Sequence, residues 1–147
     1  MGMAKQQIKG GCLCGSIRYS ATPDNMDMGL CHCNMCRKWT GGVYMMVACG
    51  SSVKVENDAD LGVYQSSKWG QRCFCKKCGT SLFWRTNDGT FCGVGAGSLD
   101  DQSPYKLAHQ VFIDEKPDTY TLADTTHNMT GAEVFAMFAD GEDSNNG

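Results

Sequence analysis

Three closely spaced cysteine motifs constrain this chain more than any other feature of its sequence. They contain seven of its ten cysteines, which are the C-x-C pair Cys12 and Cys14, the C-x-C-x-x-C cluster Cys31, Cys33 and Cys36, and the C-x-x-C pair Cys75 and Cys78. Bunched cysteines suit one metal ion better than disulfides, because a disulfide joins two Cα atoms held at a set distance. We therefore expect metal ligands in a reducing compartment rather than the alternative, disulfides in a secreted protein.

The number of ligands in these motifs predicts two different zinc sites. Structural zinc is closed by four protein ligands, whereas catalytic zinc keeps three and leaves one position open. The two pairs together supply four thiolates, so we predict that they close one structural site. The cluster has three ligands of its own, so we predict that Cys31, Cys33 and Cys36 hold a second, catalytic zinc that can be lost readily.

Other residues allow alternative sets of metal ligands. Cys49 could complete the cluster and close it, and Cys73 could replace Cys78 as a ligand, since it lies shortly before the C-x-x-C pair on the same face of an extended strand. His32 lies within the cluster, where a side chain tends to point away from the metal, although its ring could relay a proton. Cys49 and Cys92 have apolar neighbours typical of strands, where a free cysteine is usually a small buried hydrophobe.

Length and charge exclude several classes of protein. A chain of 147 residues is the size of one domain, which we place at residues 1–140 with a polar, disordered tail at 141–147. The formal charge of −3 argues against a nucleic-acid partner. No apolar stretch is long enough to span a membrane, and the N-terminus lacks the apolar core of a signal peptide. These features predict a cytoplasmic protein.

The hydrophobic pattern predicts a mostly β fold. Alternating or apolar segments typical of strands lie at residues 16–21, 43–48, 53–55, 81–85, 90–94, 110–114 and 119–122. The run at 43–48 is continuously apolar, so we expect it to be buried on both faces. Asn87-Asp88-Gly89 predicts a hairpin turn. Thr130 and Glu133 have the spacing of a capping box, which predicts a short helix near the C-terminus whose aromatic residues pack in the core.

The segments GGCLCGSIRY, CHCNMCRK, RCFCKKCGTSLF and GSLDD resemble the glutathione-dependent formaldehyde-activating enzyme family, which includes the centromere protein V domain. The resemblance extends from about Gly10 to Asp124. It implies a mostly β, Mss4-like fold stapled by zinc. It also implies two zincs, a structural one at the two pairs and a catalytic one at the cluster.

The resemblance implies a carbon–sulfur lyase that adds a glutathione-type thiol to a small aldehyde such as formaldehyde. An anionic thiol needs positive charge near the open zinc, and Arg37, Lys38 and Arg72 are the candidates beside the motifs. Trp39 and Trp69 could wall a pocket, although we expect a half-buried core tryptophan at each position. The alternative function is a non-catalytic, zinc-stabilised β module that binds a protein partner. The oligomeric state does not follow from the sequence.

Overall fold

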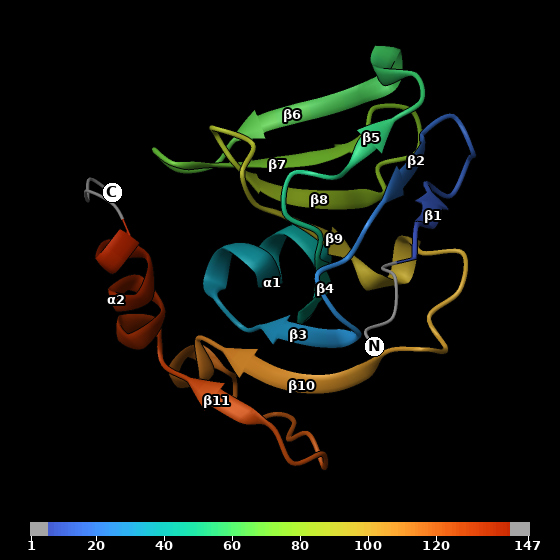
Figure 1. Ribbon diagram of the computed structural model, residues 1–147. Coiled ribbons are helices and arrows are strands. Elements are labelled where there is room, and N and C mark those ends of the chain that lie inside the picture. Colours follow the sequence, from blue (N-terminus) through green and yellow to red (C-terminus); the bar gives the residue numbers. More distant parts are fainter. Residues whose placement is uncertain (1–5, 142–147) are drawn as a thin grey trace.

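Two β-sheets make up the protein in this computed structural model, which describes residues 6–141 (Figure 1). The smaller sheet has the order β1-β2-β5, with bounds Ile8–Gly11, Arg18–Ala21 and Lys54–Val55. The larger sheet has the order β11-β10-β3-β4-β9-β8-β7-β6, with bounds His127–Met129, Lys106–Val111, Asp27–Cys31, Tyr44–Ala48, Cys92–Gly95, Ser81–Thr86, Gly70–Cys75 and Leu61–Gln65. The predicted mostly β fold is confirmed.

Most neighbouring strands pair antiparallel, but one edge of the larger sheet is parallel. β10 pairs parallel with both β3 and β11. This edge carries the last part of the chain back beside β3, whose final residue is Cys31. Residues far apart in the sequence therefore meet around the first cysteine of the cluster.

Two α-helices lie on the same side of the larger sheet (Figure 1). α1 (Asn34–Thr40) begins after Cys33, whose sulfur accepts a hydrogen bond from the Cys36 amide, and it ends at Gly41 with a φ of 86°. α2 (Gly131–Gly141) begins with the predicted capping box, in which the Thr130 amide donates to Glu133 Oε1 over 2.8 Å. Short 3-10 helices are η1 (Asp58–Asp60), η2 (Ala96–Ser98) and η3 (Ile113–Glu115). No helix among the described residues is long and apolar enough to cross a membrane.

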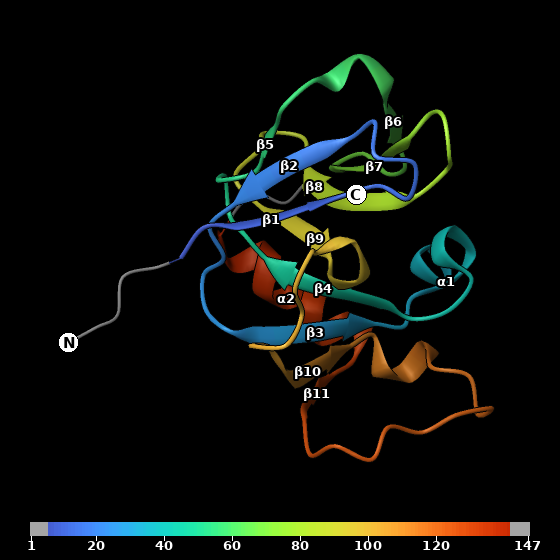
Figure 2. The same cartoon turned by 90° about the vertical axis from the view of Figure 1, so that its right-hand side faces the viewer.

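The two faces of the larger sheet pack differently. On one face, the smaller sheet covers a core that includes Tyr19, Phe83 and Val94, as Figure 2 shows from the side of β1, β2 and β5. On the other face, Tyr44 packs with the cysteine cluster and α1. Side chains of β4 pack on both faces, because successive side chains of a strand point to opposite faces of the sheet. The smaller sheet therefore fills one face and leaves the other for the cluster.

Several predicted elements are confirmed. Strands occur within or beside the expected ranges in the first two thirds of the chain, and the hairpin turns at Gly89 with a φ of 76°. A positive φ there is the reason that glycine occupies the turn. All ten cysteines are free thiols, as expected for metal ligands and buried hydrophobes rather than disulfides.

Other predictions are wrong. Residues 119–122 form no strand, and β10 instead pairs with β3 and β11. The apolar run at 43–48 is not buried on both faces, since Met45 in β4 is 38% exposed. The aromatic side chains of α2 are not core, because Phe135 and Phe138 are 49% and 37% exposed. The predicted tail at 141–147 lies outside the described residues except for Gly141, which ends α2.

Candidate metal centres and active site

Four cysteines meet where the β1–β2 turn approaches the β7–β8 turn. Cys12, Cys14, Cys75 and Cys78 place their sulfur atoms within 4.8 Å of one another. Each turn ends in a glycine with positive φ, at Gly15 and Gly79, which allows the backbone to curl around the sulfurs. An all-thiolate set of four is the donor set of structural zinc, so these residues fit that metal.

Hydrogen-bond donors lie beside the sulfurs of Cys12, Cys75 and Cys78 in this four-cysteine site. The Ile17 amide donates to Cys12 Sγ over 3.2 Å, and the Cys78 amide donates to Cys75 Sγ over 3.4 Å. The Thr80 hydroxyl lies 3.1 Å from Cys78 Sγ, and its hydrogen bond lowers the pKa of that thiol to about 5. Donors aimed at sulfur favour the charged form, which is the form that binds metal.

The three-cysteine cluster lies where β3 passes into α1. Cys31 ends the strand, Cys33 caps the helix, and Cys36 lies in its first turn. Their sulfur atoms are within 4.8 Å of one another, and no fourth Cys, His, Asp or Glu among residues 6–138 joins the group. Hydrogen bonds from the neighbouring thiols of Cys31 and Cys36 hold the pKa of Cys33 well below its ordinary value. Three thiolates fit zinc that keeps one position for a reactant.

Arg72 on β7 supplies positive charge to the cluster. Its Nη1 atom donates to Cys36 Sγ over 3.4 Å, and its guanidinium lies 5.0 Å from the centre of the Trp39 ring. Arg72 is only 5% exposed, and its Nε atom is buried without a hydrogen-bond partner. Arg72 therefore brings a buried positive charge to the thiols of the cluster.

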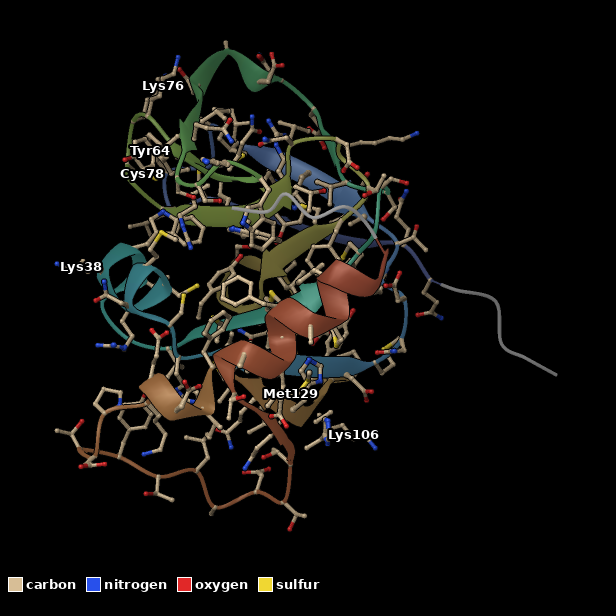
Figure 3. The ribbon with its side chains drawn as sticks, turned by 90° about the vertical axis from the view of Figure 1, so that its left-hand side faces the viewer. Lys38, Tyr64, Lys76, Cys78, Lys106 and Met129 are labelled. Atoms are coloured by element: carbon tan, nitrogen blue, oxygen red, sulfur yellow. The ribbon has the colours of Figure 1, made fainter. Side chains whose placement is uncertain are left out.

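The other two candidate cations have different surroundings. Arg37 Nε donates to the carbonyl oxygen of His32 over 2.9 Å, which ties α1 to the segment between the first two cluster cysteines. Lys38 is exposed and points away from the protein (Figure 3). Neither of them lines the cavity beside the cluster, whereas Arg72 does. Of the three candidate cations, Arg72 is the one that lines the cavity.

His32 is fully buried behind the cluster and does not join it. Its Nε2 atom donates to Gln110 Oε1 over 2.7 Å, so its Nδ1 atom accepts from the Tyr120 hydroxyl over 2.8 Å. Burial lowers the pKa of the ring, which keeps it neutral. With both nitrogens engaged, His32 holds the backbone between Cys31 and Cys33 in place and is not free to relay a proton.

The remaining cysteines also lie apart from both groups. Cys49, Cys73 and Cys92 are buried in the core on the opposite face of the sheet. Burial raises the pKa of the Cys49 thiol to about 12 and that of Cys92 to about 12 as well. The alternatives in which Cys49 completes the cluster or Cys73 replaces Cys78 are therefore not supported by the geometry.

A cavity of about 860 Å³ opens beside the cluster, between the larger sheet and α2. The three cluster cysteines and Arg72 line one part of it, and aromatic side chains line much of the rest. Trp69, expected in the core, lies in this wall against Phe138, with ring centres 5.4 Å apart. Sequence analysis missed the aromatic wall because its members come from separate strands, loops and α2.

Comparisons with known proteins agree with this arrangement. Residues 7–115 match the family described as the glutathione-dependent formaldehyde-activating enzyme, and this range contains all three motifs. The chain is 33% identical over 129 residues to a Schizosaccharomyces pombe protein named an uncharacterized lyase, covering 87% of this chain and 94% of that one. It is similar to a solved structure of a Rhodobacter sphaeroides protein, with TM-score 0.56 and 25% identity, covering 63% of this chain and 88% of that chain.

Proposed function

Because the chain belongs to the glutathione-dependent formaldehyde-activating enzyme family, we propose that it is a zinc-dependent carbon–sulfur lyase. Its reaction joins a glutathione-type thiol to a small aldehyde, for which glutathione and formaldehyde are the reference pair. The name of the S. pombe relative, a lyase, supports this class of reaction. The observation that carries the proposal is the open, three-thiol cluster at the edge of a cavity.

The two donor sets, of four and of three thiols, support different roles for the two zincs. Cys12, Cys14, Cys75 and Cys78 hold a structural zinc, and Cys31, Cys33 and Cys36 hold the catalytic one. When bound at the cluster, zinc supplies a Lewis acid that lowers the pKa of a thiol and polarises a carbonyl group. A four-thiolate site lacks the vacant position that this chemistry needs.

The chain's own residues bind and orient the reactants. Arg72 offsets the negative charge of the cluster and lines the cavity beside it. Positive charge held close to the oxygen where negative charge develops stabilises the transition state. The new bond joins the thiol sulfur to the carbonyl carbon, the carbon–oxygen π bond breaks, and the proton of the thiol ends on that oxygen. In the lyase direction the same steps reverse.

The proposal is tested by measuring exchange between glutathione and S-hydroxymethylglutathione. NMR exchange spectroscopy on the zinc-loaded protein should show exchange faster than the uncatalysed rate. Cys33→Ser should lose this acceleration while circular dichroism shows a folded protein. Cys92→Ala, which removes a buried thiol outside both sites, should keep it. Exchange at the uncatalysed rate with the zinc-loaded protein, or equal acceleration by Cys33→Ser, would refute the proposal.

A further inference from the structure

The cavity beside the cluster is far larger than formaldehyde. Its volume of about 860 Å³ lies in the range of pockets for drug-sized ligands, roughly 300–1,000 Å³. Formaldehyde has a single carbon and cannot fill this space. The cavity must therefore hold either the thiol reactant or a substituent of a larger aldehyde, and its lining decides between them.

The wall of the cavity is a continuous aromatic surface. It is formed by Phe91, Trp84, Trp69, Phe135 and Phe112, with successive ring centres 5.3 to 6.4 Å apart. Aromatic walls of this kind bind flat or apolar groups by burying their surface and stacking on their faces. The wall thus favours a hydrocarbon or aromatic group.

The charges in the wall do not match glutathione. Arg72 is the only lysine or arginine among the lining residues, and it is already hydrogen-bonded to Cys36. The lining carboxylates are those of Asp27 and Glu115, and they would repel the carboxylates of glutathione. Moving a charged group into an apolar site without a partner is strongly unfavourable. The deep part of the cavity therefore suits an uncharged group.

Part of this wall comes from outside the matched family region. The family match ends at residue 115, whereas β11 and α2 contribute Met129, Val134 and Phe135 to the lining. α2 lies across this face of the protein (Figure 3). The Gly131 amide donates to Asp114 Oδ1 over 2.7 Å, which fixes the start of the helix against η3. The size and chemistry of the cavity are thus set in part by residues outside the matched region.

Phe112, in this wall, has a strained backbone conformation. It is the one non-glycine residue with positive φ (55°) among residues 6–141, a backbone conformation unfavourable for a bulky side chain. Its ring abuts Gly131, where any side chain would collide with it. Strain of this kind tends to occur at functional sites, where surrounding contacts maintain it.

We propose that the cavity binds the apolar group of an aldehyde with an aromatic or extended hydrocarbon substituent, and that the carbonyl group lies at the end lined by Arg72 and the cluster cysteines. The identification of the bound group as an aldehyde rests on the proposed function. A thiol then reaches the carbonyl carbon from the side of Cys33, which is partly exposed. Bond making and proton transfer are those already given for the smaller aldehyde. The segment from β11 to α2 contributes to this specificity through Phe135.

Binding is tested with unreactive probes on the zinc-loaded protein. Calorimetric titration with cinnamyl alcohol, an aromatic analogue without the aldehyde, should give tighter binding than titration with S-methylglutathione. Phe135→Ser should weaken binding of cinnamyl alcohol about tenfold, as expected for loss of one ring contact. Phe135 is half exposed, so the variant should fold. Tyr64→Ser removes an exposed aromatic side chain from β6, outside the cavity, and should leave binding unchanged.

Turnover separates this inference from the proposed function. The zinc-loaded protein should accelerate formation of the hemithioacetal of glutathione with 3-phenylpropanal, a saturated aldehyde that accepts the thiol only at its carbonyl carbon. Phe135→Ser should slow that reaction more than the reaction of formaldehyde. Acceleration with formaldehyde alone would overturn the inference and leave the proposed function standing. Tighter binding of S-methylglutathione, or binding of cinnamyl alcohol that Phe135→Ser leaves unchanged, would overturn the inference. Selective binding of cinnamyl alcohol without turnover of either aldehyde would refute the lyase proposal and support only the apolar preference of the cavity.

Discussion

The four-cysteine site links parts of the chain that are far apart, so its loss should cost more stability than loss of the cluster. Cys14 and Cys75 are separated by 61 residues, with their sulfurs 3.8 Å apart, whereas Cys31 and Cys36 are five residues apart. If each metal link restricts the unfolded chain as a cross-link does, the longer loop contributes about 4 kcal/mol and the shorter about 2 kcal/mol. The matched perturbations are the two C-x-C double variants, Cys12→Ser/Cys14→Ser and Cys31→Ser/Cys33→Ser.

Thermal unfolding followed by circular dichroism measures the difference. In a chain of this size, 1 kcal/mol shifts Tm by about 2–4 °C. We therefore expect the N-terminal double variant to lose about 8–16 °C and the cluster double variant about half as much. The difference should shrink when a chelator has stripped zinc from both proteins. Equal losses in the zinc-loaded proteins, or a larger loss for the cluster variant, would refute the reasoning from loop length.

Three further predictions concern the core, the sheet and the metals. Leu82→Ala should lower the free energy of unfolding, measured by urea titration, by about 2–5 kcal/mol, because Leu82 is fully buried and its truncation leaves a cavity. A loss below about 1 kcal/mol would contradict the place of Leu82 in the core. Gly62→Ala should lower the free energy of unfolding by about 1–3 kcal/mol, because the Cβ of the new alanine would collide with the Phe74 ring. The control Gly97→Ala places its Cβ in open space and should change that free energy by less than about 0.5 kcal/mol. A zinc indicator should register release of zinc from both sites as the pH falls, because protons compete with the metal for thiolates. At neutral pH, a chelator should remove the zinc of the cluster before that of the four-cysteine site. Simultaneous release of both zincs at neutral pH would contradict an open site at the cluster.

Strands β2, β4, β5, β8 and β9 could be predicted because they show local alternation or an apolar run beside clear turn signals, whereas β1, β3, β6 and β7 were not predicted. The pairing of the C-terminal region could not be predicted, because β10 depends on hydrogen bonds to β3 and β11 rather than on a local hairpin. Residues 119–122 look like a strand by composition, yet Tyr120 is used in a long-range hydrogen bond to buried His32. Long-range partners of this kind leave no signal in a local pattern.

The candidate site, like the fold, could be predicted only in part from the sequence. Motif spacing is enough to suggest which cysteines gather, although their occupation by zinc remains a prediction. The aromatic wall could not be predicted, since an apolar stripe on a helix has the same sequence pattern whether it faces a core or a cavity. Arg72 was one of three candidate cations, and only the pairing of β7 within the sheet places it beside Cys36.

The distribution of the cysteines also sets an order of events during synthesis on the ribosome. The whole cluster lies within residues 31–36, so a nascent chain carries all three of its thiols early. The four-cysteine site needs Cys78, so its N-terminal pair has no partners until more than half of the chain has been made. A cell short of zinc during translation would thus leave the staple between the two turns incomplete longest, and newly made chains would be the population most exposed to proteolysis.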